Sequence, residues 1–448
     1  MIRPEHTSRR TFVKTLASGA VGAGLTATLP AASAASPLRR MPPTERVGVA
    51  IVGAGGRGTP LAEGFARLDV AEVVFVCDPD AQRAAEVVGK VSALGQRPRA
   101  VADFRRALES ADVDAVVIAT PDHWHTPAAM LAMQAGKHVY VEKPASHNAR
   151  EGELIVEASR RYSRVVQMGN QRRSWPKVAE GIERVRRGDI GPVHYARGWY
   201  ANARDSIGVG KRGPAPSHLD YELWQGPAPR EPFRDNILHY NWHWFWNWGT
   251  GEVGNNGVHA LDLCRWGLDV DRPIRVTSTA GRYYWDDDQE TPDTQVLTFE
   301  FPDERTIAWE GMSCNRRGIE GSGFGASFHG RDGALVIEGF GYALYDRAGK
   351  LVEKVTGGEA GEIGVTGPGF AADRAHLENF LAAIRSGERL RAPIDDGQRS
   401  TLLCHLGNIA HRTGRTLRVD PASGHILDDA EAMQLWSRTY APGWEPSL

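Results

Sequence analysis

A glycine-rich segment at residues 53–58 has the composition of a loop that binds the phosphates of a dinucleotide. It matches G-x-G-x-x-G, directly after an apolar run, and its candidate phosphate-binding residues are Gly53, Gly55, Gly56, Arg57 and Gly58. Glycine permits a tight turn, close approach of the backbone to a pyrophosphate, and close packing of a helix on a strand. The helix expected to follow would add free N–H groups and a positive dipole end.

An acidic residue follows the next apolar run at the spacing that dinucleotide sites require. Asp78 is placed to accept hydrogen bonds from the ribose hydroxyls, and its charge would repel a 2′-phosphate. The expected cofactor is therefore NAD, with NADP disfavoured. The alternative is a plain glycine-rich turn in which Asp78 only caps the next helix.

Two further polar segments stand where later strands of the same sheet should end. One contains Thr120, Pro121 and His125, and the other is Glu142-Lys143-Pro144. Ligands of such sheets bind outside the carboxyl ends of the strands, so both segments should face the cofactor.

With these segments the sequence resembles the glucose–fructose oxidoreductase / inositol dehydrogenase (Gfo/Idh/MocA) family. The matching residues are the glycine loop, Thr120-Pro121 with His125, residues 135–139, and Glu142-Lys143-Pro144. The resemblance extends in outline over the whole chain that follows the N-terminal segment. It is specific only in the first third of that chain. It implies that Glu142 helps to fix the cofactor, that Lys143 hydrogen-bonds the nicotinamide ribose and a substrate hydroxyl, and that the Pro144 peptide is cis.

The chemistry of alcohol oxidation explains the need for a lysine at this place. Hydride transfer from an alcohol carbon requires a base for the hydroxyl proton and a group that stabilises developing negative charge. An ammonium group beside the oxygen suits the second task. The alternative for Lys143 is a surface salt bridge.

A candidate partner stands in the second half of the chain. The resemblance implies that His259 is the acid–base group, but the aspartate usual four residues earlier is Asn255 here. An amide can orient a substrate and cannot take a proton, so proton transfer would rest on His259 with Lys143. Asp262, one helical turn later, is a candidate to pair with His259 or contact substrate, with a structural salt bridge as the alternative.

Other candidates for ligand contact are polar or aromatic. Asn170 or Gln171 is predicted near the nicotinamide and Arg172 near a substrate hydroxyl, with a solvated turn as the alternative. Trp199 and Trp244, the latter within the alternating tryptophans of 242–248, could stack on a sugar ring. Core packing explains these tryptophans equally well. His123 and His125 form H-x-H without a third ligand at a convincing spacing, so no metal is predicted.

The elements that must position these residues are of two kinds. Short buried runs alternate with helical stretches over 45–168, which predicts a doubly wound parallel sheet, the NAD-binding Rossmann domain. After 169 longer alternating strands appear, such as 293–301, 305–313 and 333–337. We therefore predict an α/β chain in which 169–448 forms a substrate and oligomerisation domain with an open, mostly antiparallel sheet.

The N-terminus is predicted to lie outside the fold. Residues 8–14 read as a twin-arginine motif, an apolar stretch follows, and 32–34 offers a small-residue cleavage site. A signal peptide over 1–34, a linker over 35–44 and a periplasmic or extracellular mature protein follow as expectations. The apolar stretch is too short and glycine-rich for a membrane span.

Composition narrows the partners. A net charge of −2 does not suggest a nucleic-acid surface, and 41% apolar residues suit a globular core. The four cysteines lie far apart and are interpreted as buried apolar side chains rather than disulfides. The family's open sheet implies a homodimer or homotetramer.

Together these features predict a tightly held NAD that exchanges hydride with a secondary alcohol of a sugar, glycoside or polyol. One alternative is a glycosidase that oxidises a ring carbon transiently, eliminates the aglycone and then reduces the product. A second alternative is a cofactor-bound sensor without catalysis.

Overall fold

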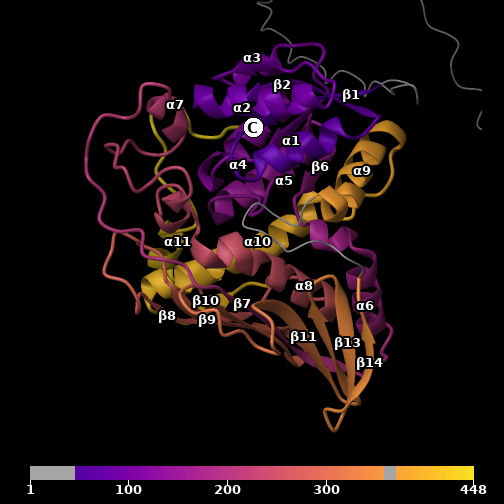
Figure 1. The fold of residues 1–448 in the computed structure, drawn as a ribbon. Helices are drawn as coiled ribbons and strands as arrows, with labels where there is room; N and C mark the ends of the chain where they lie inside the picture. Colours follow the sequence, from indigo (N-terminus) through magenta and orange to yellow (C-terminus); the bar gives the residue numbers. More distant parts are fainter. Residues whose placement is uncertain (1–45, 358–369) are drawn as a thin grey trace, which may run out of the picture. The chain divides into compact units, whose positions relative to one another are not determined.

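The computed structural model describes residues 46–357 and 370–448. The predicted signal peptide over 1–34 and the linker over 35–44 lie outside these residues. The described residues form two sheets and the helices that cover them (Figure 1).

The first sheet contains six parallel strands in the order β3-β2-β1-β4-β5-β6. The strands are β1 (Val47–Val52), β2 (Ala71–Cys77), β3 (Arg99–Val101), β4 (Ala115–Ile118), β5 (His138–Val141) and β6 (Val166–Met168). All six residues of β1 are buried, as expected for an apolar strand covered on both faces. The strand order reverses between β1 and β4, which opens a crevice at their carboxyl ends. The predicted Rossmann-like parallel sheet is confirmed.

Helices cover both faces of this sheet. They are α1 (Gly58–Ala66), α2 (Ala81–Ala93), α3 (Arg105–Leu108), α4 (Asp122–Gln134) and α5 (Ala149–Arg161). A late helix, α9 (Phe370–Ser386), also packs on α1, and its Leu377 and Phe380 join the same core cluster as Phe65. The core of the parallel sheet therefore includes side chains from near the end of the chain.

Helix α4 begins five residues earlier than the sequence predicted. The sequence pattern predicts a helix over 127–135 that ends at Gly136. The helix starts at Asp122 and contains Pro127. Proline leaves the carbonyl of His123 without its helical donor, and Arg438 donates to that oxygen at 2.8 Å instead. A distant arginine thus makes this internal proline tolerable.

The second sheet has ten strands in the order β14-β13-β12-β11-β7-β10-β9-β8-β15-β16. The strands are β7 (Val193–Ala201), β8 (Arg275–Gly281), β9 (Thr294–Phe301), β10 (Arg305–Met312), β11 (Phe324–Gly330), β12 (Gly333–Glu338), β13 (Gly341–Asp346), β14 (Leu351–Val355), β15 (Leu417–Val419) and β16 (Ile426–Leu427). Only the β7–β10 pair is parallel among these. The predicted mostly antiparallel sheet is confirmed.

Three helices cover one face of this second sheet. They are α6 (Pro176–Arg186), α8 (Val258–Leu268) and α10 (Ile394–Thr413), with α8 on β7, β10 and β11. Buried and partly exposed residues alternate along β9, so its second face is not covered in the same way. Helix α8 continues from a π-helical turn, η3 (Val253–Gly257), which bears on the site described below.

The remaining elements are short. They are η1 (Gln171–Ser174), α7 (Tyr221–Gln225), η2 (Asn241–Trp244), η4 (Pro302–Glu304) and α11 (Ala430–Gln434). The tryptophan-rich segment 242–248 forms no strand, and Trp242, Phe245 and Trp248 belong to a small core cluster with Trp224. Core packing therefore accounts for much of this segment.

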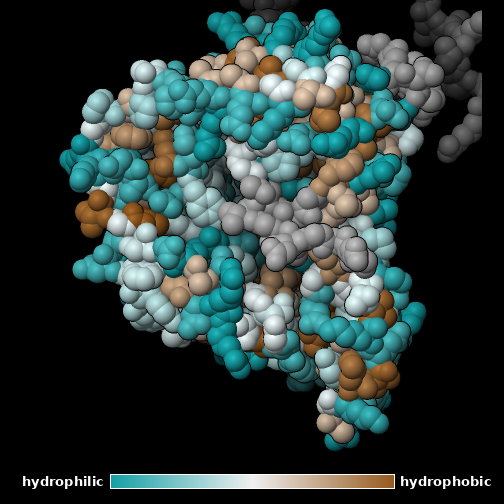
Figure 2. All heavy atoms as spheres, viewed as in Figure 1, coloured by the Kyte–Doolittle hydropathy of each residue, from teal (hydrophilic) through white to brown (hydrophobic). Residues whose placement is uncertain are grey.

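The surface and the cysteines add two observations. The visible, coloured part of the face in Figure 2 is mostly hydrophilic with small separate hydrophobic patches. All four cysteines are free, and three are buried, as the sequence indicated. Within the part of the chain that the structure describes, no helix is both long and apolar enough to cross a bilayer.

Candidate active site

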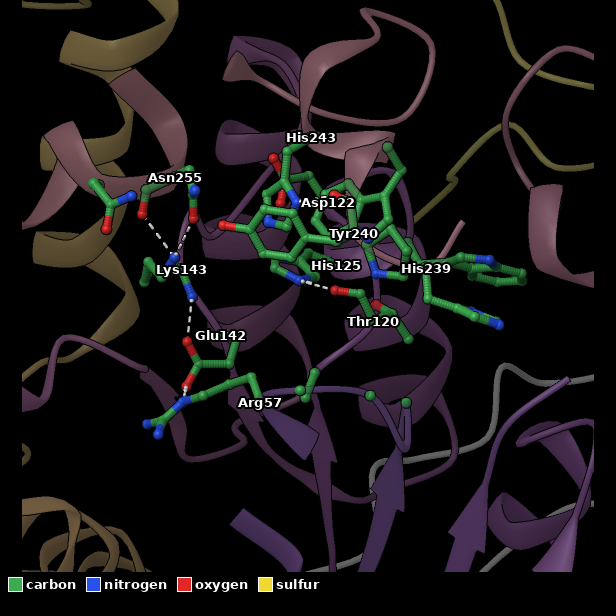
Figure 3. A pocket seen from close by; sticks show the side chains of 18 of the residues that line it. Arg57, Thr120, Asp122, His125, Glu142, Lys143, His239, Tyr240, His243 and Asn255 are labelled. Carbon is green, nitrogen blue, oxygen red and sulfur yellow. Dashed lines mark hydrogen bonds and ion pairs between the residues drawn. The ribbon is translucent and has the colours of Figure 1, made fainter. Parts of the chain in front are cut away.

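A pocket of about 740 Å³ opens at the carboxyl ends of β1, β2, β4 and β5. One wall comes from the loops of the parallel sheet, including the glycine loop, Asp78 and Lys143. The other wall comes from the second half of the chain, including Tyr240, Asn255 and His259. Figure 3 shows Lys143 and Asn255 meeting across the boundary between these two walls. The structure thus brings most of the predicted site residues into one cavity.

The glycine loop has the shape that a pyrophosphate requires. Gly53 has φ +94°, and an added Cβ there would lie 2.5 Å from the Ala119 carbonyl oxygen. A Cβ on Gly58 would lie 1.7 Å from the Gly53 oxygen, so only glycine lets α1 start this close to β1. Gly55 and Gly56 line the pocket with backbone. Helix α1 begins at the end of this loop, so its N-terminus adds a positive dipole end there.

Asp78 lies at the end of β2 with its carboxylate against the glycine loop. It accepts hydrogen bonds from the N–H of Ala54 at 2.6 Å and from the N–H of Asp80 at 2.8 Å. Burial raises the pKa of Asp78, and these N–H groups oppose that shift. Each carboxylate oxygen can accept a further hydrogen bond, so ribose hydroxyls could still bind. The capping alternative is not observed, because Asp80 caps α2.

Arg57 is partly buried and bound to carboxylates, so it is not a free phosphate ligand. Its Nε donates to Glu142 at 2.8 Å, and its two Nη atoms donate to Asp373 at 2.6 and 3.0 Å. These carboxylates overcome desolvation and raise the pKa of Arg57 well above its usual range. The bond to Asp373 fixes the glycine loop to α9, a partner that no local pattern in the sequence signals.

His125 connects the two polar loops of the parallel sheet. Its Nδ1 lies 2.6 Å from the Pro144 carbonyl oxygen, and its Nε2 lies 2.9 Å from the Thr120 carbonyl oxygen. Thr120, Pro121 and His125 all line the pocket, and the Thr120 hydroxyl is buried without a protein partner among the described residues. The Lys143–Pro144 peptide is cis, as the resemblance implied.

Lys143 reaches across the pocket to Asn255. Its Nζ donates to the backbone oxygen of Asn255 at 2.7 Å and to its Oδ1 at 3.2 Å (Figure 3). Burial lowers the pKa of Lys143, while the charges of Glu142, Asp122 and Glu252 act in the opposite direction. Asn255 therefore contacts the lysine directly and orients its ammonium group.

His259 lines the same pocket from the start of α8. Asn255 lies in the π-helical turn that leads into α8, one turn before His259, and both residues line the pocket. Burial and the neighbouring cations Lys143 and Arg172 lower the pKa of His259 well below its usual value. The ring is therefore neutral at pH 7 and can accept a proton.

Five predicted site residues do not line the pocket: Gly58, Asn170, Trp199, Trp244 and Asp262. Asp262 forms a bidentate ion pair with Arg173 at 2.7 and 2.8 Å and is absent from the pocket lining, which matches the structural salt bridge left open above. Trp199 is a core residue whose indole donates to Ser322, and Trp244 is buried beneath Arg204. The assignment of these three residues to substrate contact is therefore not supported. Asn170 is buried beside the pocket-lining Gln171, with both amide atoms unpaired among the described residues.

The sequence missed a polar cluster on the second wall. Arg204 pairs with the buried Glu252 at 2.8 Å and donates to the hydroxyl groups of Tyr240 at 2.9 Å and Tyr200 at 3.2 Å. The hydroxyl of Tyr240 points toward Lys143 and Asn255 in Figure 3. Only the position of Glu252, three residues before Asn255, offered a local signal for this cluster.

The sequence predicts no metal site, and the side chains of the described residues bear on that prediction. No cluster of three His, Cys, Asp or Glu side chains that could hold a metal occurs within residues 46–357 and 370–448. His123 belongs to the H-x-H pair, but its Nε2 contacts the Trp224 carbonyl oxygen at 3.0 Å.

Comparisons with known proteins agree with this geometry. Residues 47–170 match the Gfo/Idh/MocA oxidoreductase family with its NAD-binding Rossmann fold, and 205–323 match the C-terminal α/β domain of the same family. The glycine cradle, Asp78 and the unpaired Thr120 hydroxyl fit the NAD that this domain binds.

Individual relatives include dehydrogenases and glycosidase-named proteins. An inositol 2-dehydrogenase from Rubrobacter xylanophilus is 34% identical over 168 residues, covering 37% of this chain and 47% of that protein. A glycosyl hydrolase family 109 protein from Shewanella pealeana is 32% identical over 170 residues, covering 34% of this chain and 37% of that protein. The chain thus matches about half or less of the length of these relatives.

A solved structure supports the fold alone. The aldose–aldose oxidoreductase from Caulobacter crescentus superposes with a TM-score of 0.63 at 19% identity, covering 84% of this chain and 100% of that one. The two family matches together span more than half of the sequence, in the order and positions of the two sheets. The chain therefore belongs to the Gfo/Idh/MocA family of NAD-binding oxidoreductases.

Proposed function

We propose that this protein is an NAD-dependent enzyme that oxidises or reduces a secondary alcohol of a sugar, glycoside or polyol. The observation that carries the proposal is the position of Lys143. Its ammonium group lies in the same pocket as the glycine loop, and two of its three N–H groups are used on Asn255. The third N–H is available to an alcohol oxygen.

The first wall of the pocket would hold the cofactor. The backbone of Gly55 and Gly56 would bind the pyrophosphate, Asp78 the ribose hydroxyls, and Thr120 and Asn170 offer unpaired polar atoms nearby. When bound, NAD supplies the hydride acceptor or donor.

Lys143 on the first wall would stabilise the charge on oxygen, and His259 on the second wall would handle the proton. Lys143 would hydrogen-bond the reacting oxygen and stabilise negative charge there, with Asn255 and Glu142 fixing its position and charge. His259, neutral because of burial and adjacent cations, would accept the hydroxyl proton during oxidation and return it during reduction.

The class of substrate follows from the relatives and from the lining. Inositol 2-dehydrogenase and aldose–aldose oxidoreductase are among the similar proteins. The lining here includes aromatic rings with polar tips, which suit the C–H faces and hydroxyls of a sugar: Tyr200, Tyr240 and Trp242.

A substrate panel tests this proposal. Purified protein loaded with NAD is mixed with neutral and acidic sugars, glycosides and polyols, and formation of reduced nicotinamide is followed by absorbance. Reduction by at least one alcohol is expected. Protein that holds NAD and reduces it with none of these alcohols would contradict the proposal.

A redox-neutral glycosidase is the second candidate. Its support is that several relatives are named glycosyl hydrolase family 109 proteins, at 30–34% identity over 32–43% of this chain. Release of free aglycone from aryl glycosides without net change in bound NADH would favour it over the dehydrogenase. Net NADH formation without aglycone release would exclude it.

Export and self-association are further proposals. The twin-arginine motif and small-residue site in residues 8–34 support export, and the open second sheet supports a homodimer or homotetramer. Because the twin-arginine route carries folded proteins, NAD would travel inside the pocket. Fractionation of the native host with an antibody, together with light scattering of the purified protein, tests both proposals.

A further inference from the structure

Arg172 is a buried cation in the pocket without a carboxylate partner among the described residues. Its side chain is 7% exposed and lines the pocket. Its one hydrogen bond to the described protein is from Nη1 to the Gly339 carbonyl oxygen, at 3.3 Å. A guanidinium carries five N–H donors, so most of them have no protein acceptor here.

The other buried arginines behave differently. Three arginines within 46–357 and 370–448, Arg172 among them, are at most 7% exposed. The other two, Arg173 and Arg265, face carboxylates of Asp262 and Asp396. A buried charge is normally paired, because desolvation costs several kcal/mol per ion. Arg172 departs from this rule, and burial alone lowers its pKa to about 9.

Aromatic packing holds the Arg172 guanidinium in a fixed plane. Its Cζ lies 3.8 Å from the centroid of Phe324 and 4.6 Å from that of Trp175. Cation–π contacts compensate part of the desolvation and leave the edges of the guanidinium for planar hydrogen bonding. A carboxylate accepts two parallel N–H bonds from such an edge.

The acidic side chains near Arg172 do not balance the positive charge on this side of the pocket. Arg204 is balanced by Glu252, but Arg316 also lines the pocket and has no ion pair among the described residues. Arg316 belongs to the segment between β10 and β11, and Phe324, the first residue of β11, contacts Arg172. The substrate side therefore presents two cations that no described acid offsets.

We propose that the substrate is an acidic sugar whose carboxylate binds Arg172, as in a uronic or aldonic acid. This rests on the proposed function and narrows its substrate class. The carboxylate would lie in the same pocket as His259, because Arg172 and His259 both line it, and the charge of Arg172 helps to lower the pKa of His259. Its negative charge would offset part of that effect and move the pKa of His259 upward, toward the range useful for proton transfer.

Binding measurements on the NAD-loaded protein test the inference. Calorimetry compares D-glucuronate with its neutral isostere D-glucuronamide, and galacturonate and mannuronate with their amides. At least one acid should bind roughly tenfold more tightly than its amide, because charged hydrogen bonds are stronger than neutral ones. Arg172→Gln should bring this ratio close to one, and Arg172→Lys should retain part of it. Arg317→Gln, an exposed neighbour outside the pocket lining, should retain all of it.

The outcomes separate the two proposals. Equal affinity for acids and amides, preference for the amides, or no detectable binding of any acid overturns the inference, as does tighter binding of a sugar phosphate than of every uronate. Acid binding without NADH formation from any alcohol overturns the proposed function and leaves standing only the carboxylate-binding site at Arg172. Equal turnover of neutral and acidic sugars overturns the preference for an acidic sugar and leaves the proposed function standing. If an Arg172 variant does not fold, the comparison of acid and amide binding to the wild-type protein still decides whether the site prefers a carboxylate.

Discussion

The contact between Lys143 and Asn255 decides how the pocket places a positive charge. In the related pattern an aspartate stands at position 255, whereas here an amide accepts from Nζ at 3.2 Å and the backbone oxygen accepts at 2.7 Å. The carboxylates around the lysine are Glu142, Asp122 and Glu252, which oppose the lowering of its pKa by burial. The ammonium form is therefore maintained by Glu142, its neighbour in the sequence, together with Asp122 and Glu252, which are distant in the sequence.

Asn255→Asp should shift the alkaline side of the pH profile. Because the pKa of Lys143 is lowered, the ammonium group is lost earlier than usual as pH rises, and activity that needs it falls with it. A carboxylate beside Nζ favours the ammonium and should raise that pKa by about one unit. The alkaline limb of kcat/KM should then move to higher pH by a similar amount.

Asn247→Asp is the matched control for this change. It adds the same charge to a residue that donates to Pro229 and is not part of the pocket lining. The control should keep the wild-type alkaline limb. If Asn255→Asp also left that limb unmoved, Lys143 would not be the group whose ionisation limits activity.

At the scale of elements, the junction of β1 and α1 depends on the absence of side chains. The N-terminus of α1 approaches the end of β1 so closely that a Cβ on Gly58 would overlap the Gly53 oxygen. Arg57, between them, is bound to Glu142 after β5 and to Asp373 in α9. The phosphate loop is thus fixed from three elements.

Gly58→Ala should impair NAD binding by distorting this loop. The Cβ contact of 1.7 Å with backbone forces a shift of the loop or of α1. We expect nucleotide affinity to decrease at least tenfold, corresponding to about 1.4 kcal/mol, together with a lower melting temperature. Fluorescence titration with NADH and a thermal melt measure the two effects.

Gly89→Ala provides the comparison within α2. A Cβ there meets nothing within 4 Å. It should stabilise the protein by about 0.5–1 kcal/mol, since alanine is the better helix former, and leave NADH affinity unchanged. Equal NADH affinity in the Gly58 variant would refute the role assigned to the glycine loop.

Sequence patterns predicted the elements whose signals are local. The parallel strands, the glycine loop and the strand-end segments with Thr120 and Lys143 appear where periodicity and motif placed them. Features that depend on distant partners were not predictable. Arg438 makes Pro127 acceptable inside α4, Asp373 binds Arg57, and Arg173 removes Asp262 from the pocket. Trp199 and Trp244 are likewise buried in the core, whereas their sequence pattern was compatible both with core packing and with stacking on a sugar ring.

At the scale of the whole molecule, buried neutral histidines link stability to pH. Burial lowers the pKa of His123 and His405 to about 3 and that of His138 and His376 to about 4. In the unfolded chain these groups titrate near 6.5. Between about pH 4 and 6.5 the unfolded state therefore binds more protons than the folded state, and stability decreases as pH falls.

Thermal unfolding from pH 7.5 to pH 5 should show this dependence. Each such histidine contributes about 1.4 kcal/mol for every pH unit below its unfolded pKa. His405→Gln should reduce the slope of unfolding free energy against pH, although it also removes the contact with Ser146. His194→Gln, at an exposed position, should leave the slope unchanged. A flat profile for the wild-type protein would contradict the burial of these rings as neutral groups.

The most direct test of the account asks whether the ammonium group of Lys143 is needed for hydride transfer but not for retention of NAD. Wild-type protein and Lys143→Met are loaded with NAD, the bound nucleotide is quantified, and reduction is followed with the best alcohol from the panel. The account predicts equal nucleotide content and a loss of turnover by a factor of about 10²–10³ in the variant. A variant that retains NAD and turns over at the wild-type rate would contradict the account.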